Sequence, residues 1–206
     1  MPTLLIHDHI LVNKYEFGIR LPFSKTWLTK PTIPKRGDIV VFRSVESDTF
    51  FLIKRVIGLP VDEISYDEKG QLFINGKPIP RHLMKDPNHW MNDDFYRASA
   101  VDVESNLNDL KFYDESLGSK DVRTILRNQD YRTEQAPLKI PPDHLFLMGD
   151  NRDNSRDSRF WGLLPTKNLL GRAMFVWLSC TQTFESAPFL CNPLTVRWKR
   201  FFHSIQ

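Results

Sequence analysis

The sequence predicts a mostly β protein: an antiparallel β core built from both ends of the chain, with a smaller, loop-rich β or α+β domain inserted into it. Three observations lead to this fold class. Apolar segments are short and rich in β-branched residues, turn-forming residues separate them, and a long polar stretch interrupts the middle of the chain. We expect residues 1–64 and 139–206 to form the core and 65–138 to form the insertion.

The segments expected to form strands occur in two groups. Before the polar stretch they lie at residues 10–12, 39–42, 50–57 and 72–74. Asn75 and Gly76 follow the last of these, and both central residues of a type I′ turn need positive φ, so a β-hairpin is expected there. After the polar stretch, strands are expected at 144–148 and 171–178. From about 84 to 135 the periodicity is unclear, which favours loops.

Composition excludes several classes of protein. The chain has 206 residues, of which 41% are hydrophobic and 26% charged, so it is large enough to bury a core. Its net charge of +3 comes from basic and acidic residues scattered along the whole length, so nucleic acid is not an expected partner. No apolar run approaches the roughly 20 residues of a membrane-spanning helix, and the pattern of a signal peptide is absent. The chain opens directly on apolar residues, so we expect a segment upstream of Met1.

The two cysteines, Cys180 and Cys191, lie close together near the C-terminus. Neither a CxxC spacing nor a nearby histidine pair accompanies them, which argues against a zinc site. In an oxidising compartment they would close a short loop, and in the cytosol they would be two thiols.

Lys54 is the first candidate for chemistry. Alternation along residues 50–58 places Lys54 on one face of the strand and Arg55 on the other, and periodicity does not decide which cation points inward. An ammonium surrounded by apolar side chains loses its proton more readily than in water, whereas a guanidinium keeps its proton. Lys54 is therefore a candidate general base. The alternative is an ordinary strand lysine whose ammonium reaches solvent.

The polar segment 149–162 is the second candidate. Its Asp, Asn and Ser side chains bond readily to nearby backbone and would hold the loop rigid. Its alternating Arg and Asp residues would form buried, mutually satisfied pairs, which suits a site better than a solvated turn. A solvated turn remains the alternative.

Four segments in a fixed order carry a recognisable pattern. They read Met-Pro-Thr-Leu-Leu-Ile at 1–6 followed by Asp8, Arg-Gly-Asp-Ile-Val-Val-Phe at 36–42, Ile-Lys-Arg-Val-Ile-Gly-Leu-Pro at 53–60, and Gly-Asp-Asn-Arg-Asp-Asn-Ser at 149–155 with Asp-Ser-Arg at 157–159 and Trp-Gly at 161–162. This pattern resembles the boxes of bacterial type I signal peptidases. The resemblance covers both ends of the chain, and the polar middle resembles the second domain of Gram-negative members.

The resemblance implies a membrane-bound serine endopeptidase that removes signal peptides from exported proteins after an Ala-x-Ala-like site. It implies a Ser/Lys dyad, no cofactor or metal, a monomer, and a place at the bacterial inner membrane with the catalytic part on the periplasmic side. In the family the nucleophile lies in a Ser-Met-x-Pro-Thr-Leu box, and Met1 matches its variable position. We therefore expect the serine and the membrane anchor upstream of Met1, and the 206-residue chain to be inactive by itself.

Other roles transfer position by position. Lys54 matches the general base, Ser155 matches a serine that orients this lysine, and Asp157 with Arg159 matches a supporting ion pair. Three positions match the lining of the pockets for small side chains at the first and third residues before the cut: Ile10, Val41 and Ile53. Such shallow apolar pockets would favour alanine.

Two positions depart from the pattern of the enterobacterial enzymes. Arg156 replaces a small residue beside the binding pocket, and Phe51 replaces a polar one just before Ile53, which affects the expected pocket shape. The two cysteines lie outside the middle domain, where some relatives carry a disulfide, so that crosslink does not transfer.

Near the C-terminus, aromatic residues alternate with basic ones. The aromatic residues are Trp177, Phe184, Phe189, Trp198, Phe201 and Phe202, and the basic ones are Arg197, Lys199 and Arg200. This mixture suits a membrane headgroup boundary. The alternative is that most of these aromatic side chains pack in the core.

Two other functions fit parts of the pattern. A serine-free relative with the same fold would bind signal sequences or secretion-complex partners without cleaving them. The related self-cleaving repressors also use a Ser/Lys dyad on a β core, but they need a helical DNA-binding domain, and no such segment is visible in the sequence.

Overall fold

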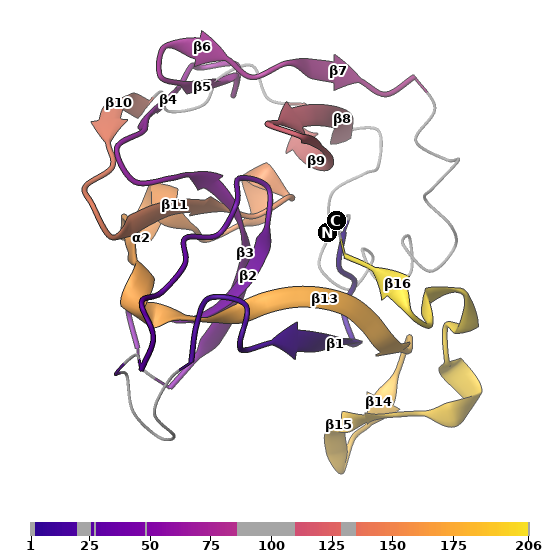
Figure 1. Cartoon of the computed structure of the whole chain (residues 1–206). Helices are drawn as coiled ribbons and strands as arrows, with labels where there is room; N and C mark the ends of the chain where they lie inside the picture. The colour runs from indigo at the N-terminus through magenta and orange to yellow at the C-terminus, as the bar shows by residue number, and fades with distance from the viewer. Residues whose placement is uncertain are drawn as a thin grey trace.

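The computed structural model (Figure 1) describes residues 3–19, 26, 28–47, 49–85, 110–128 and 135–205. Its strands are β1 Asp8–Asn13, β2 Ile39–Arg43, β3 Phe51–Gly58, β4 Glu63–Tyr66, β5 Leu72–Ile74, β6 Lys77–Pro78, β7 Arg81–Leu83, β8 Leu110–Leu117, β9 Lys120–Arg127, β10 Gln135–Lys139, β11 His144–Met148, β12 Leu164–Pro165, β13 Leu169–Ser179, β14 Thr183–Phe184, β15 Ala187–Cys191 and β16 His203–Ser204. Its helical segments are short: η3 Arg152–Asn154, α2 Ser158–Trp161, η4 Thr166–Asn168, η5 Pro193–Thr195 and η6 Trp198–Arg200. The prediction of a mostly β fold is confirmed. Within the described residues, no helix combines the length and the apolar character needed to cross a bilayer.

The largest sheet combines strands from both ends of the chain. Its order is β1-β13-β2-β3-β11-β12, with β16 also paired to β13, and its pairs are antiparallel. The long strand β13 crosses the molecule in Figure 1 and joins β1 to β2. Val40 and Phe42 of β2, Val56 of β3 and Leu145 and Leu147 of β11 point into one buried apolar cluster. Burying this alternating set of apolar side chains stabilises the sheet on which the site is built.

Two smaller sheets come from the chain between β3 and β11. One has the order β10-β4-β5-β6 and the other β7-β8-β9. A second apolar cluster joins them to the main sheet, because Ile57 and Phe146 pack there with Ile64, Leu117 and Val122. The predicted domain boundaries, after residues 64 and 138, remain a proposal. Strand β4 spans the first boundary and its partner β10 spans the second.

The predicted turn at Asn75 and Gly76 is confirmed. Both residues have positive φ, 53° and 72°, and they connect the antiparallel strands β5 and β6. Asn75 also uses its side chain, since its Oδ1 accepts a hydrogen bond from the backbone N–H of Glu63 at 2.8 Å. The turn is therefore fixed by its backbone conformation and by a contact with β4.

The middle segment, which is expected to be loop-rich, contains more regular β structure than its unclear periodicity indicates. Strands β8 and β9 form an antiparallel hairpin over their full length, from Leu110 paired with Arg127 to Leu117 paired with Lys120. Gly118, with φ of 68°, begins the two-residue turn between them. The rest of the predicted loop region, residues 86–109 and 129–134, lies outside the described residues.

Cys180 and Cys191 are joined by a disulfide, so the crosslinked alternative is the one the structure contains. The bond connects the residue that follows β13 to the last residue of β15. It closes the base of the projecting β14–β15 hairpin, which Figure 1 shows at lower right.

Candidate active site

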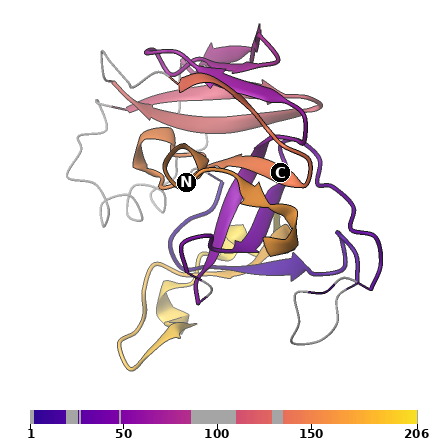
Figure 2. The same ribbon diagram turned by 90° about the vertical axis from the view of Figure 1, so that its left-hand side faces the viewer.

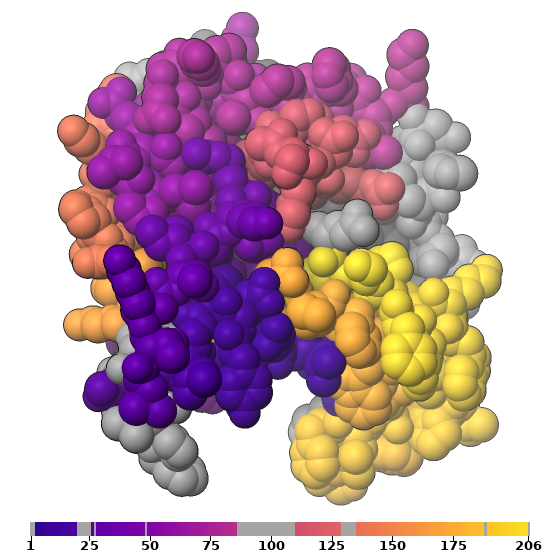
Figure 3. All heavy atoms as spheres, viewed as in Figure 1, coloured from indigo at the N-terminus to yellow at the C-terminus, as the bar shows by residue number. Residues whose placement is uncertain are grey.

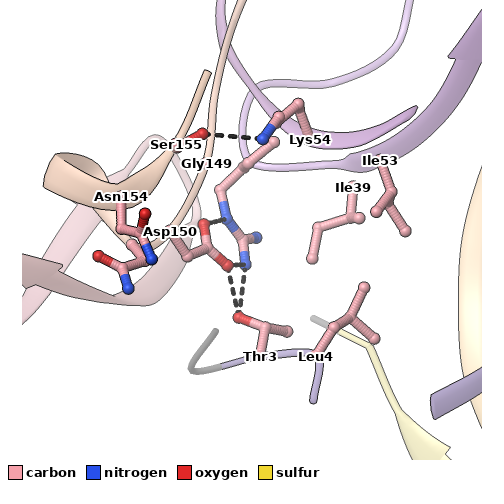
Figure 4. A pocket seen from close by; sticks show the side chains of 11 residues that line it. Thr3, Leu4, Ile39, Ile53, Lys54, Gly149, Asp150, Asn154 and Ser155 are labelled. Carbon is pink, nitrogen blue, oxygen red and sulfur yellow. Dashed lines mark hydrogen bonds and ion pairs between the residues drawn. The ribbon is translucent and has the colours of Figure 1, made fainter. Parts of the chain in front are cut away.

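Lys54 and Ser155 meet in the structure, although 101 positions separate them in the sequence. Lys54 lies in β3, and its Nζ donates a hydrogen bond of 2.8 Å to Oγ of Ser155, the residue that follows η3 (Figure 4). Gly149 makes this approach possible. A Cβ at Gly149 would lie 2.2 Å from Ser155 Oγ and 3.5 Å from Lys54 Nζ, so a side chain there would occupy the space of the hydroxyl.

The surroundings of Lys54 favour its neutral form. Burial of the ammonium is the main cause that lowers the pKa of Lys54 below its ordinary value, and the positive charge of Arg159 acts in the same direction. The carboxylates of Asp157 and Asp150 oppose this effect without cancelling it. Lys54 is therefore a better proton acceptor near neutral pH than a solvated lysine.

Asp157 and Arg159 form the expected ion pair beneath this contact. Asp157 is completely buried, and its carboxylate accepts hydrogen bonds of 2.8 Å from both Nε and Nη2 of Arg159 and of 2.9 Å from the backbone N–H of Gly149. Burial alone would raise the pKa of Asp157, but the hydrogen bonds and charge of Arg159, with further hydrogen bonds from Gly149 and Ser155, lower it. The pair therefore stays ionised and fixes the backbone on either side of Ser155.

Arg55 and Asp150 form a second buried ion pair, which was not among the predicted site residues. Arg55 is only 1% exposed, and its Nε and Nη2 donate to the two carboxylate oxygens of Asp150 at 2.7 and 2.8 Å. The hydroxyl of Thr3 donates to Asp150 at 2.6 Å and accepts from Arg55 at 3.1 Å. Burial would raise the pKa of Asp150, but the charge and hydrogen bonds of Arg55 and the hydroxyl of Thr3 hold it at about 2.

This second pair settles which cation of β3 is fully enclosed. Arg55 is the buried one, whereas Lys54 is partly exposed and faces the pocket. Alternation alone left this open, because each face of the strand carries one cation among apolar neighbours. The carboxylate of Asp150 decides which cation points inward, because it binds the guanidinium of Arg55.

The Arg55–Asp150 pair, Lys54 and Ser155 border one pocket of about 120 Å³. Its apolar wall consists of Leu4, Ile39 and Ile53, and Figure 4 shows these side chains gathered on one side. Its polar wall carries Thr3, Lys54, Arg55, Gly149, Asp150, Asn151, Asn154 and Ser155. The pocket thus places an extended apolar surface beside a lysine with a lowered pKa.

Of the three predicted pocket residues, Ile53 lines this pocket. Val41 is paired with Ile53 across β2 and β3. Ile10 packs, like Ile53 and Leu4, against the buried cluster that contains Ile39 and Val176. The structure therefore brings the three residues to one region, with Ile53 nearest to Lys54, and it adds Leu4 and Ile39, which sequence reasoning missed as site residues.

The two departures from the family pattern lie outside the pocket lining. Arg156 is exposed and forms a bidentate ion pair with Glu46, on the turn between β2 and β3. Phe51 is also exposed, with the guanidinium of Arg43 over its ring. Both changes alter the outer surface beside the site rather than its wall.

The expected pairing among the Arg and Asp residues of the polar loop is only partly right. Arg159 pairs with Asp157 inside the loop, whereas Arg152 pairs with Glu115 of β8 and Arg156 with Glu46. Asp153 accepts a hydrogen bond of 2.6 Å from the backbone N–H of Arg127. Much of the support of this loop therefore comes from residues that are distant in the sequence.

In the described part of the chain, no cluster of three or more His, Cys, Asp or Glu side chains has the geometry to hold a metal ion. Lys54, whose pKa is lowered, lies within hydrogen-bond distance of the hydroxyl of Ser155 and near two carboxylates. Lowering the pKa of an amine makes it more available to accept a proton from a hydroxyl nucleophile.

Comparison with known proteins identifies the family of this chain. The sequence model of the family described as signal peptidase, peptidase S26, matches residues 1–178. A signal peptidase I of Pseudomonas fluorescens is 37% identical over 192 residues, which cover 86% of this chain and 61% of that protein. The corresponding protein of Pseudomonas aeruginosa is 35% identical over 189 residues, with the same coverage of 86% and 61%.

A more distant relative matches along more of its own length. The signal peptidase I of Aquifex aeolicus is 31% identical over 211 residues, which cover 94% of this chain and 77% of that protein. By contrast, the chain spans about 61% of the length of the Pseudomonas relatives. Taken with the match to the family model, these similarities show that the chain belongs to the signal peptidase family of S26 peptidases.

Proposed function

We propose that this chain is the catalytic part of a serine endopeptidase that cleaves signal peptides from exported proteins after an Ala-x-Ala-like site. The nucleophile we propose is the serine of a Ser-Met pair that directly precedes Met1. The observation that carries the proposal is the contact between Lys54 and Ser155 in a pocket that Thr3 and Leu4 also line. The proposed serine precedes Thr3 in the chain, and Thr3 lines the same pocket as Lys54.

The proposed reaction has two halves. Neutral Lys54 takes the proton of the serine hydroxyl while the serine oxygen attacks the carbonyl carbon of the scissile peptide bond. The C–N bond then breaks, and the lysine ammonium gives its proton to the leaving amine. In the second half, Lys54 takes a proton from water, the hydroxide attacks the ester carbonyl, and the proton returns to the serine oxygen as the ester bond breaks.

Ser155 acts on the lysine and not on the substrate. Its Oγ accepts the hydrogen bond from Lys54 Nζ, which turns the amine toward the pocket and limits the rotamers of a long side chain. The carboxylate of Asp157 accepts from the backbone N–H of Gly149 and pairs with Arg159, which joins the two ends of the loop segment that carries Ser155. We assign Ser155, Asp157 and Arg159 as positioning residues.

The apolar wall supports a preference for small side chains before the cut. Leu4, Ile39 and Ile53 leave a pocket of about 120 Å³ for part of an extended peptide. These side chains also pack against the core, so the wall yields little to a bulky substrate side chain.

We further propose that the enzyme works at the bacterial inner membrane, with this part on the periplasmic side. All six predicted C-terminal aromatic residues are exposed, with Trp198 at 73% and Phe202 at 70%, so the alternative that most of them are core residues is wrong. We call this set, with the exposed Leu190 and Leu194, the C-terminal aromatic surface; Figure 3 shows this part of the chain in yellow. An exposed apolar surface of this kind suits a lipid headgroup boundary.

The basic residues contribute less to this surface than the sequence predicts. Arg197 is buried and donates to the backbone oxygen of Ile6 and to Ser179, and Arg200 forms an ion pair with Asp8. Lys199 remains exposed. Contact with lipid should therefore depend mainly on apolar side chains.

The proposed activity is tested by cleavage of a peptide with an Ala-x-Ala site in detergent. Three chains are compared: the 206-residue chain, the same chain extended by Ser-Met, and a matched control extended by Ala-Met. We expect cleavage only with the Ser-Met extension. Cleavage by the Ala-Met control would place the nucleophile elsewhere in the chain. If none of the three chains cleaves the peptide but they bind it, a protein that binds signal sequences without cutting them would be favoured.

A further inference from the structure

The β8–β9 hairpin of the middle segment lies directly against the loop that carries Ser155. Figure 2 shows the hairpin above this loop, and hydrogen bonds join the two at β9 and at the centre of β8. The hairpin contributes no residue to the pocket lining. Any role it has in the site must therefore act through the loop.

Backbone contacts form the first connection. The N–H of Ile125 in β9 donates to the carbonyl of Asp150 at 2.9 Å, and Ile125 forms a parallel bridge with Asn151. Two residues further along β9, the N–H of Arg127 donates to the carboxylate of Asp153 at 2.6 Å. The loop is thus fixed to the edge of β9 at two points, by a single bridge at Asn151 and by the side chain of Asp153.

A buried ion pair forms the second connection. Arg152 of the loop donates to both carboxylate oxygens of Glu115 in β8, at 3.1 and 2.5 Å. The two residues are 3% and 1% exposed. Because removing one partner of such a pair leaves an uncompensated buried charge, this contact ties the loop strongly to the hairpin.

A third connection reaches the strand that carries the lysine. Lys120, at the start of β9, donates to the buried carboxylate of Asp38 at 2.7 Å. The adjacent Gly37 donates its N–H to Val56 of β3 at 2.8 Å and accepts from the guanidinium of Arg55 at 2.7 Å. One end of the hairpin is therefore fixed beside β3, while its middle and far end hold the loop.

We propose that the β8–β9 hairpin is a positioning element of the active site, and that Glu115 and Arg152 are positioning residues that keep Ser155 within hydrogen-bond distance of Lys54. The effect of this hairpin on catalysis rests on the proposed function. Its effect on the distance between Ser155 and Lys54 does not, because that contact exists without substrate. A role of this kind explains why a segment outside the pocket carries a buried charge aimed at the loop.

The test compares Glu115→Gln with a matched control, Arg156→Gln, in the 206-residue chain. Both changes remove one charge of an ion pair made by the same loop, but the pair of Arg156 is exposed. Two quantities are measured: hydrogen exchange of backbone amides in residues 150–155 relative to those of β13, and the pKa of Lys54 from an NMR titration of labelled lysine.

For Glu115→Gln we expect loop amides to exchange at least about tenfold faster relative to β13, the factor expected for one lost charged hydrogen bond. We also expect the pKa of Lys54 to move upward, toward its ordinary value, because a looser loop admits water to the ammonium. For Arg156→Gln we expect neither change. If Glu115→Gln does not fold, Lys120→Met replaces it in the test, because it removes the third connection at a partly exposed position. We expect Lys120→Met also to speed exchange of the loop amides and to raise the pKa of Lys54.

Two results would overturn the proposal. One is faster exchange in the loop and β13 alike with an unchanged pKa of Lys54, since this is what a general stabilising contact would give. The other is no change in either quantity. Neither the hydrogen exchange of the loop nor the pKa of Lys54 requires cleavage. A failure of the proposed peptidase activity would appear only in the peptide assay, so it is distinguishable from a failure of the positioning role.

Discussion

Gly149 is the residue at which the site has the least free space. We predict that Gly149→Ala in the Ser-Met-extended chain displaces Ser155 from Lys54, because the new methyl group would lie 2.2 Å from Ser155 Oγ. The cleavage rate should fall about tenfold to a hundredfold, as for Ser155→Ala, since both changes remove the same hydrogen bond to an amine. Steady-state kinetics with the Ala-x-Ala peptide measures this.

Gly58→Ala is the matched control for this change. Its methyl group would lie 2.3 Å from Cδ1 of Ile140, in the apolar cluster and away from the pocket, so it should cost about 1–3 kcal/mol of stability through overpacking. Below its unfolding transition it should cleave at the normal rate. Equal loss of rate in both glycine variants would show that stability, not the Lys54–Ser155 contact, explains the effect.

Asp150 links the site to stability at low pH. Its pKa of about 2 in the folded protein lies below the ordinary value of about 3.9 for Asp, so its ionised form stabilises the fold by about 2 kcal/mol above pH 4. This contribution is lost as the pH falls through about 2, because the unfolded chain binds the proton first.

We therefore predict that Asp150→Asn lowers the free energy of unfolding by about 3 kcal/mol at pH 7, since Arg55 is left buried without its counter-charge. The difference from the unsubstituted protein should shrink between pH 4 and pH 2. Urea unfolding at several pH values measures both effects, and a difference independent of pH would contradict the assigned ionisation.

The sequence predicts the site residues to which the family pattern assigns a role. Lys54 follows from the chemistry of its strand and from the resemblance to the signal peptidases, and Ser155, Asp157 and Arg159 follow from the resemblance. The pair of Arg55 and Asp150 spans 95 positions, and the contact of Thr3 with Asp150 spans 147. Periodicity reports only on neighbours along one strand, so it gives no information about such partners.

At the scale of single elements, the β14–β15 hairpin depends on a covalent bond. The disulfide closes a short loop, with Cys180 and Cys191 11 positions apart in the sequence. We predict that reduction, or Cys180→Ser with Cys191→Ser, costs on the order of 3 kcal/mol and loosens this hairpin first. Hydrogen exchange should show lost protection in residues 183–191, with the amides of β2 and β3 unaffected. An equal loss in all three elements would mean that the bond stabilises the whole fold.

The hairpin β8–β9 shows why element prediction failed in the middle of the chain. Its exposed and buried positions do not alternate regularly, and buried Glu115 and Thr124 make an inward-facing set look polar. Gly118 and Ser119, a two-residue pair typical of hairpin turns, were the signal available. The sequence predicts β1, β2, β3, β11 and β13 of the main sheet because their buried positions are mostly apolar, whereas it does not predict the two-residue strands β12 and β16.

At the scale of the whole molecule, the C-terminal aromatic surface is joined to the main sheet through β13, which carries Trp177 and leads into the β14–β15 hairpin. We predict that the 206-residue chain binds lipid vesicles and that Trp198→Ala with Phe201→Ala weakens binding several-fold. Since Arg197 and Arg200 are used in internal contacts, added salt should have little effect. Vesicle co-sedimentation measures this, and binding that the double variant leaves unchanged would contradict a lipid role for these residues.

The central claim is that Lys54 is the general base of a signal peptidase. It is tested most directly by the pH dependence of kcat/KM for the Ser-Met-extended chain, with Lys54→Ala measured alongside. We predict that kcat/KM rises with a single ionisation whose midpoint lies below the ordinary lysine pKa of about 10.4, and that Lys54→Ala folds normally but does not cleave. A midpoint at the ordinary value, or cleavage by Lys54→Ala at the normal rate, would contradict the claim.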